Sequence, residues 1–252
     1  MRTCRDIARS GGSIAGRAIF LLVALAALGG GARAQDKRDP TTIVVFGDSQ
    51  AQGLAVGLQR YLIGRPRYKV LNRTHPGAAI VHGESEWLDP IRYFLAHEKA
   101  DIAIVMLGAN DRLDMRVGKD DRYLHFKTAA WREEYARRLG MILSTLDGAR
   151  LKSVWLGNPI ARSPTYSADM SYINGIIEER VAAAGAQFIP LWNVVVDDGG
   201  KYAAYGKDLE GTTERLRTDD GIHFTAAGYR LVAARIMSAV FSKTAAATVP
   251  AM

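Results

Sequence analysis

The stretch "IAIVML" (residues 102–107) contains six apolar residues in succession and is the strongest strand signal in the chain. A short run with no polar residue predicts a strand that is covered on both of its faces. Strands of this kind are typical of parallel sheets with helices packed on each side. We therefore expect residues 102–107 to form one of the central strands of such a sheet.

Further apolar runs alternate with helix-like stretches on both sides of this strand. This alternation predicts an α/β fold, with a parallel sheet of five strands between two layers of helices. Thr225 is a candidate N-cap for the last helix, because its hydroxyl can accept a hydrogen bond from a free backbone N–H. The other predicted strands are 42–46, 68–72, 153–157 and 187–192, and the predicted helices are 51–64, 86–99, 129–146, 170–181 and 225–241.

Two connections stand out by their length, residues 111–127 and residues 193–219. Both are rich in charged residues, glycine and tyrosine. Long loops in compact domains are usually either functional or disordered. We therefore expect these two segments to form the walls of a substrate cleft.

The beginning of the chain has the pattern of a secretion signal. Four arginines precede or border an apolar stretch at 18–30, and "ARA" (32–34) supplies the small residues of a cleavage site. The apolar stretch is shorter than the roughly 20 residues that a membrane span needs. We therefore expect cleavage, no stable membrane insertion afterwards, and a periplasmic or secreted protein; an uncleaved anchor is the alternative.

These observations divide the chain of 252 residues into four parts. A single domain of this size can bury a substantial core. The parts are the signal peptide (1–34), a short linker (35–41), the folded domain (42–242) and a flexible tail (243–252).

Composition excludes several classes of function. Cys4 is the only cysteine, so the mature chain has neither a disulfide nor a thiolate nucleophile. The formal charge of +7 comes mostly from the arginines of the signal segment, and no basic cluster alternates with aromatic residues, so we expect no nucleic-acid partner. His82 and Glu84 resemble part of a zinc deaminase motif, but the cysteines of that motif are missing. We expect no metal and no cofactor, since no His-Glu-x-x-His motif or Gly-rich phosphate loop is present.

Polar residues follow the predicted strands directly. Ser49 follows the first strand, Gly77 follows the second, and Asn110 follows "IAIVML"; Asp220 and His223 precede the last helix. Ligands of open α/β sheets bind beyond the carboxyl ends of the strands. We therefore expect these residues to converge on one edge of the sheet.

This set of residue types suits acyl transfer through a serine. A serine hydroxyl needs a neighbouring base, and histidine titrates in the right range. A carboxylate such as Asp220 can orient the imidazole ring and stabilise its protonated form. The oxyanion that develops needs donors already in place, which backbone N–H groups and an Asn amide can supply. Each motif alone also has a structural explanation, as a turn or a helix cap.

The blocks "FGDSQ", the Gly77 turn, "GAND" and "DGIH" resemble those of the SGNH (GDSL-type) hydrolases, over about residues 42–242. This resemblance implies a flavodoxin-like, three-layer fold, with Ser49 as nucleophile, His223 as base and Asp220 as its orienting acid. It also implies an oxyanion hole made of the Ser49 and Gly77 N–H groups and the Asn110 side chain. Three longer stretches are similar to sequences of a bacterial envelope subgroup of this superfamily, DUF459. They are "GANDR", "AAWREEYARR" and "LRTDDGIHFTAAGY".

The chain departs from the SGNH pattern at Gln50, where leucine is usual. This position does no chemistry itself, so the departure bears on packing and on the acyl or glycan preference. Asp48 and Asp111 adjoin the predicted site, and we expect them to form local hydrogen bonds in turns.

Four further residues are candidate substrate contacts. Arg112 and Arg162 follow predicted strands, and Tyr205 lies in a long loop. Trp87 follows the Gly77 segment and could stack on a sugar, although packing in the core is the alternative.

The sequence favours an exported serine esterase that removes short acyl groups, such as acetyl, from carbohydrate or other envelope-associated esters. An O-acyltransferase with the same triad is an alternative, because the first half-reaction is identical. A third possibility is a glycan-binding module without turnover.

Overall fold

The computed structural model describes residues 39–118 and 122–245. The predicted signal peptide (1–34) and most of the predicted linker lie outside these residues. The last helix continues to Ala245, so the predicted tail begins in a helix, and the rest of that tail lies outside the described part of the chain.

Five parallel strands form the central sheet, as predicted, in the order β2-β1-β3-β6-β7. The predicted flavodoxin-like α/β fold is confirmed by this order, in which the chain starts in the middle of the sheet and crosses over once. The first strand therefore has a neighbour on each side, and the residues that follow it lie near the centre of the sheet edge. The strands are β1 (Thr41–Gly47), β2 (Tyr68–Thr74), β3 (Ile102–Met106), β6 (Lys152–Leu156) and β7 (Gln187–Ile189).

Six helices lie within the described residues, and each of the five predicted helices overlaps one or two of them. Thr225 caps the last helix as predicted, since its Oγ1 accepts a hydrogen bond from the Gly228 N–H (3.2 Å). The helices are α1 (Ser49–Tyr61), α2 (Glu84–Trp87), α3 (Asp89–His97), α4 (Ala129–Gly148), α5 (Pro164–Ala183) and α6 (Ala226–Ala245).

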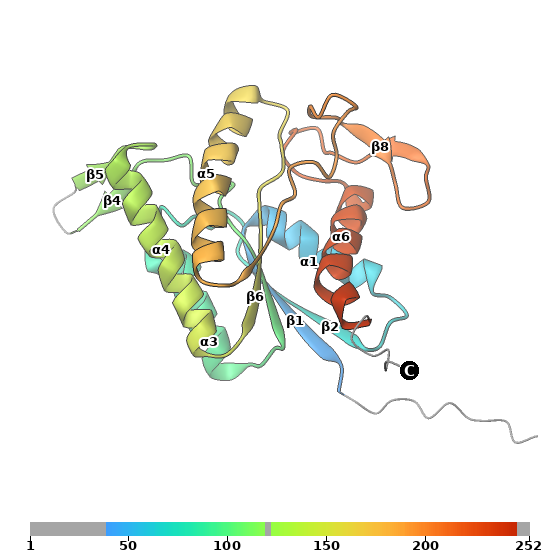
Figure 1. Cartoon of the computed structure of the whole chain (residues 1–252), viewed down its shortest axis with the longest axis horizontal. Coiled ribbons are helices and arrows are strands. Elements are labelled where there is room, and N and C mark those ends of the chain that lie inside the picture. Colours follow the sequence, from blue (N-terminus) through green and yellow to red (C-terminus); the bar gives the residue numbers. More distant parts are fainter. Residues whose placement is uncertain (1–38, 119–121, 246–252) are drawn as a thin grey trace, which may run out of the picture. The chain divides into compact units, whose positions relative to one another are not determined.

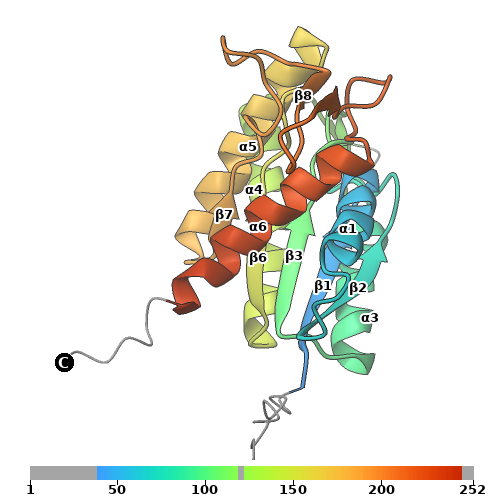
Figure 2. The same ribbon diagram turned by 90° about the vertical axis from the view of Figure 1, so that its right-hand side faces the viewer.

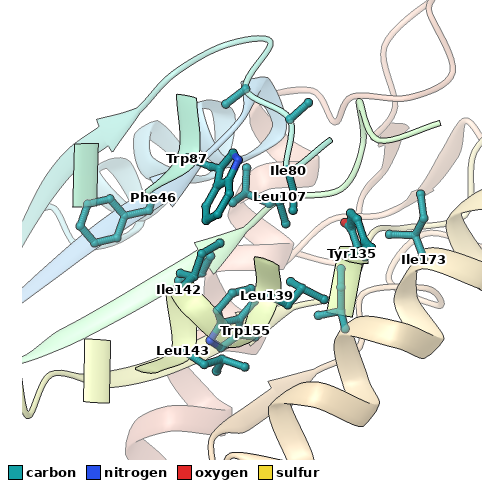
Figure 3. Packing of buried hydrophobic residues seen from close by; sticks show 14 of the residues in the cluster. Phe46, Ile80, Trp87, Leu107, Tyr135, Leu139, Ile142, Leu143, Trp155 and Ile173 are labelled. Carbon is teal, nitrogen blue, oxygen red and sulfur yellow. The ribbon is translucent and has the colours of Figure 1, made fainter. Parts of the chain in front are cut away.

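Both faces of the sheet are covered by helices (Figures 1 and 2). Side chains alternate along each strand, so β1 sends Ile43 and Val45 to one face and Val44 and Phe46 to the other. The first pair packs against α1 and α6, and the second pair packs in a larger cluster with α3, α4 and α5 (Figure 3). Burial on both faces explains why the central strands β1 and β3 consist mainly of apolar residues.

The structure differs from the sequence prediction in two places. The predicted helix 86–99 is divided at Leu88 into α2 and α3, because Pro90 lacks an N–H and starts a new helix better than it continues one. Each long loop contains a short antiparallel hairpin. The strands of these hairpins are β4 (Met115–Val117) with β5 (Arg122–Leu124), and β8 (Tyr205–Lys207) with β9 (Thr213–Arg215).

Helices α1 and α6 approach each other closely at Gly53 and Gly57. A Cβ atom on Gly53 would lie 2.1 Å from the Tyr229 ring, and one on Gly57 would lie 2.8 Å from Cβ of Tyr229. Glycine at these positions therefore lets Tyr229 lie directly on the backbone of α1. No helix in the described ranges is both long and apolar enough to cross a bilayer.

Gly→Ala substitutions should have opposite effects at Gly53, which contacts Tyr229, and at Gly175, which has free space around it. Gly53→Ala should lower the free energy of unfolding by about 1–3 kcal/mol, because the new methyl group displaces the ring. Gly175→Ala in α5, where nothing lies within 4 Å of the added Cβ, should raise it by about 0.5–1 kcal/mol. Urea denaturation measures both values, and an increase in stability for Gly53→Ala would contradict the packing described.

Candidate active site

Ser49, His223 and Asp220 form a continuous chain of hydrogen bonds at the carboxyl edge of the sheet. Oγ of Ser49 lies 2.8 Å from Nε2 of His223, and Nδ1 of the same ring lies 2.6 Å from Oδ2 of Asp220. Ser49 is the first residue of α1, directly after β1, so it lies at the positive end of the helix dipole. The structure thus brings together three residues that the sequence separates by up to 174 positions.

The turn that carries Asp220 fixes its carboxylate. Oδ1 of Asp220 accepts hydrogen bonds from the Thr218 hydroxyl (2.6 Å), the Ile222 N–H (2.8 Å) and the His223 N–H (3.0 Å). Partial burial raises the pKa of Asp220, but these hydrogen bonds and the one to the His223 ring outweigh burial and hold it well below its usual range. The carboxylate therefore stays ionised and fixed beside the imidazole.

Arg217 holds this turn from inside the protein, and the sequence analysis did not identify it. Its side chain is fully buried and donates hydrogen bonds to the carbonyl oxygens of Ile160 (2.8 Å), Ile222 (2.9 Å) and His223 (3.3 Å). The guanidinium group also lies over the Phe224 ring, 4.4 Å from its centroid. Arg217 thus connects the segment after β6 with the turn that carries the histidine.

The Gly77 turn and Asn110 are joined to each other. Nδ2 of Asn110 donates to the Ala78 carbonyl (3.0 Å), which leaves the second hydrogen of this amide for another acceptor. Gly77 has a φ of +86°, and nothing lies within 4 Å of where its Cβ would be. Glycine adopts this left-handed backbone conformation without strain, and the absence of a side chain leaves the backbone open there.

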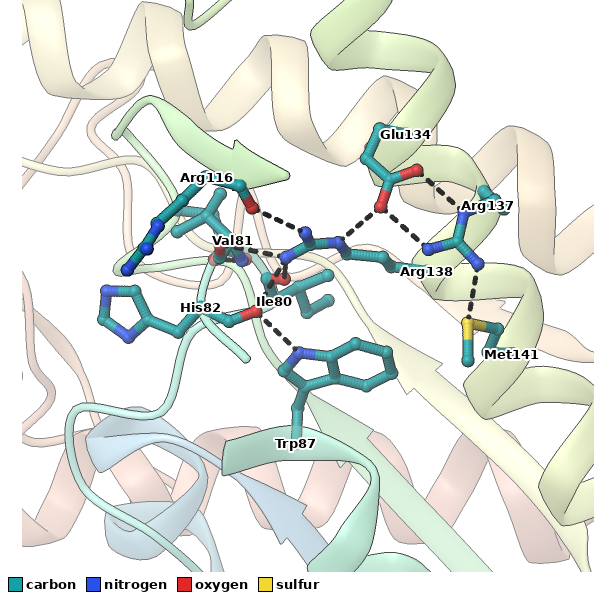
Figure 4. A network of polar contacts seen from close by, with 10 residues as sticks. Ile80, Val81, His82, Trp87, Arg116, Glu134, Arg137, Arg138 and Met141 are labelled. Carbon is teal, nitrogen blue, oxygen red and sulfur yellow. Dashed lines mark hydrogen bonds and ion pairs between the residues drawn. The ribbon is translucent and has the colours of Figure 1, made fainter. Parts of the chain in front are cut away.

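Arg138 is a second buried arginine that holds a loop of the site (Figure 4). Its Nη1 lies 2.8, 2.9 and 2.7 Å from the carbonyl oxygens of Ile80, Val81 and His82, and its Nε donates to Glu134 (2.8 Å). The segment after Gly77 is therefore wrapped around one guanidinium group from α4. The stretch "AAWREEYARR" contains this arginine, but nothing in its spacing shows that the partners are backbone carbonyls.

Asp48 and Asp111 are fully buried beside the site; Asp48 makes a local hydrogen bond, as predicted, whereas those of Asp111 extend further. Asp48 caps α1 by accepting from the Gln50 N–H (2.9 Å), and its Oδ2 has no partner among the described residues. Asp111 accepts from the Val81 N–H (3.1 Å) and from the Tyr135 hydroxyl (2.7 Å), so it joins three segments rather than one turn. Burial raises the pKa of Asp48 to about 7 and that of Asp111 to about 6.

The predicted substrate contacts occupy different environments. Arg112 is partly exposed, donates to Asp169 (2.6 Å) and lies over the Tyr166 ring, whose hydroxyl donates to the Ala109 carbonyl beside Asn110. Arg162 adjoins the Asp220 turn, because its N–H donates to the Gly221 carbonyl (2.9 Å).

The other two predicted contacts lie on a hairpin and in the core. Tyr205 is exposed on the β8–β9 hairpin. The prediction for Trp87 is corrected: its side chain packs in the core, the residue is 3% exposed, and its indole N–H donates to the His82 carbonyl. A ring without an exposed face cannot stack on a sugar.

A groove opens beside Ser49 and His223. It has a volume of about 510 Å³ and is lined by one side of α1, by the beginning of α6 and by Asn72 of β2. Gly53, Gly57 and Tyr229, which form the close helix contact, lie along it.

Solved structures of several esterases share this fold. An acetyl xylan esterase, AlAXEase, is 18% identical and superposes with a TM-score of 0.54 over 79% of this chain and 100% of its own. A catalytic mutant of an acetylxylan esterase from Geobacillus stearothermophilus is 14% identical, with a TM-score of 0.54 over 78% and 92% of the two chains. A GDSL-like lipase from Bacteroides thetaiotaomicron is 14% identical, with a TM-score of 0.53 over 82% and 92%. The architecture is therefore that of the SGNH (GDSL-type) hydrolases.

Within this class of fold, the family can be stated. The model of the family described as "Protein of unknown function (DUF459)" matches residues 42–239, so the chain belongs to the DUF459 family. This confirms the resemblance drawn from the sequence motifs. A search of curated proteins found no match.

The raised pKa of Asp48 predicts a specific dependence of stability on pH. The folded protein holds this proton more tightly than the unfolded chain does, since the pKa rises from 3.8 to about 7 on folding. The contribution of Asp48 to the free energy of unfolding is therefore largest below about pH 4, and it is lost as the pH rises to about 7. Asp48→Asn cannot ionise, so its melting temperature relative to the wild type should improve between about pH 5 and about pH 8.

Asp147→Asn is the matched control, because it alters an exposed carboxyl group of α4. The difference in melting temperature between Asp147→Asn and the wild type should not change between about pH 5 and about pH 8. The assignment to Asp48 would be wrong if the two variants behaved alike.

Proposed function

We propose that this protein is a serine esterase that uses Ser49, His223 and Asp220 as a catalytic triad. The hydrogen-bond chain from the Ser49 hydroxyl through the imidazole to the Asp220 carboxylate carries this proposal. The same order of groups activates serine in unrelated hydrolases, where it is identified by geometry rather than by sequence position. The shared fold with esterases supports the same reaction class.

In the proposed reaction, Nε2 of His223 accepts the Ser49 proton while Oγ attacks the ester carbonyl. Asp220 stabilises the imidazolium, for which its ionised state is required. The imidazolium then gives its proton to the leaving alcohol, and an acyl-enzyme remains on Ser49. Water, activated by the same imidazole, releases the acid and restores the serine.

The negative charge on the carbonyl oxygen would be stabilised by three donors. They are the backbone N–H groups of Ser49 and Gly77 and the side-chain amide of Asn110. The helix N-terminus at Ser49 and the tie from Asn110 to the residue after Gly77 support this assignment, because they hold the donors before substrate arrives. Arg112 and Arg162, on loops that follow strands of the sheet, are proposed substrate contacts, and so is Tyr205 on the β8–β9 hairpin.

We further propose a short acyl group, such as acetyl, on a carbohydrate as the substrate. Two structures with the same fold are described as acetyl xylan esterases, which is the reason for this choice. Export to the periplasm or beyond, with the signal segment removed, would bring the enzyme to envelope or extracellular carbohydrates.

Covalent labelling tests the nucleophile. A fluorophosphonate should add one adduct to the wild type, seen as a single mass increase in the intact protein, and no adduct to Ser49→Ala. Ser144→Ala, which alters an exposed serine of α4, should be labelled like the wild type. Folded wild-type protein that gains no adduct would remove the esterase proposal and favour a glycan-binding module.

Asn110→Ala tests the oxyanion hole. The loss of one such donor should lower kcat for an aryl acetate about 10²–10³-fold with little change in KM. The melting temperature should fall only slightly, since the side chain makes one hydrogen bond to Ala78. A variant that stays folded and hydrolyses the ester at the wild-type rate would exclude Asn110 from this role.

A further inference from the structure

One side of α1 forms a continuous wall that starts at the proposed nucleophile. Six residues of this helix line the groove of about 510 Å³: Ser49, Gln52, Gly53, Val56, Gly57 and Arg60. Their spacing alternates between three and one residues, which places them on a single face of the helix. The groove therefore follows the helix axis from the beginning of α1 to its last turn.

The opposite wall continues directly from His223. Phe224, Ala226 and Tyr229 line it, and the Tyr229 ring lies against the backbone of α1 at Gly53. The lining of the groove is mostly apolar or uncharged, and it includes no carboxylate. Arg60 is its only arginine or lysine.

The groove lies on the side of Ser49 that adjoins the histidine. His223 lines it, whereas Gly77 and Asn110, the proposed oxyanion donors, do not. In the proposed reaction the imidazolium protonates the leaving oxygen, so the alcohol part of the ester must lie next to His223. This groove is therefore suited to the alcohol part of the substrate rather than to the acyl group.

Arg60 lies at the far end of the groove, in the last turn of α1. It lies eleven positions after Ser49 in the helix, so its Cα lies about 16 Å from that of Ser49. The residue is exposed, and its side chain forms no ion pair or hydrogen bond with residues 39–118 or 122–245. A guanidinium group in this state can bind a carboxylate or a phosphate through two parallel hydrogen bonds.

We propose that the groove binds the alcohol part of an acidic oligosaccharide and that Arg60 pairs with an anionic group on it. The ligand chemistry is a chain of sugars or polyols that carries a carboxylate or a phosphate, with the ester several units away from that charge. The length of the groove favours an oligomer over a single sugar. The assignment of the alcohol part rests on the proposed esterase function, whereas the charge preference of the groove does not.

Equilibrium binding to the Ser49→Ala protein tests this inference without turnover. Calorimetry would compare a short oligogalacturonate, a short glycerol-phosphate oligomer and a neutral xylo-oligosaccharide of similar length. We expect one or both anionic probes to bind more tightly than the neutral one, which also distinguishes a carboxylate from a phosphate source. Failure of both anionic probes to bind, or equal binding of all three, would overturn the proposal.

Arg60 is then tested by substitution in the same Ser49→Ala background. Arg60→Gln should weaken binding of the preferred anionic probe about tenfold, as expected for a hydrogen-bonded charge pair, and Arg60→Lys should restore part of the loss. Arg67→Gln is the matched control, because Arg67 is exposed and does not line the groove. Its affinity should equal that of the parent protein.

An equal effect of Arg60→Gln and Arg67→Gln, or an equal loss for the neutral probe, would also contradict the role of Arg60. The labelling of Ser49 by a fluorophosphonate is independent of these binding data. Failure of the esterase proposal and failure of the charge preference are therefore distinguished by separate measurements.

Discussion

The edge of the sheet depends on the close approach of the ends of β1, β2 and β3 at Gly47. This residue has a φ of +140°, and a Cβ atom would lie 1.8 Å from the Met106 carbonyl oxygen, so only glycine fits. Its own carbonyl accepts from the His75 N–H (2.8 Å), and the next N–H, that of Asp48, donates to Met106 (3.3 Å). The ends of β1, β2 and β3 are thereby fixed to one another. The positions of these strand ends therefore determine where Ser49, the Gly77 turn and Asn110 lie, since each follows a strand end within a few residues.

Buried charged side chains hold the loops that follow these strand ends. Arg217 and Arg138 bind backbone carbonyl oxygens, which are numerous where chains turn without regular structure. Asp111 binds a backbone N–H and a tyrosine hydroxyl on another helix. Buried charges are costly unless their hydrogen bonds are satisfied, so each of these contacts also restricts the loop to one conformation.

The sequence predicts the sheet and the gathering of Ser49, His223 and Asp220, because both depend on local patterns. Uninterrupted apolar runs such as residues 102–107 identify buried parallel strands, and the polar residues directly after them must gather at one edge. The hairpins were not predicted, because three-residue strands leave too short a pattern. Arg217 and Arg138 were missed since their partners are backbone atoms of distant segments, which no residue type reveals. Trp87 shows the same difficulty in reverse: its sequence neighbourhood lies near the site, but its ring points into the core.

The contact of Tyr229 with the backbone of α1 links the two halves of the proposed triad mechanically. Ser49 begins α1, and His223 lies three residues before α6, so the seam at Gly53 and Gly57 sets the separation of these two helices. Because the Tyr229 ring packs directly on the backbone at Gly53, little space is left for the two helices to shift relative to each other. The separation of the serine hydroxyl and the imidazole ring is therefore set by helix packing before any substrate binds.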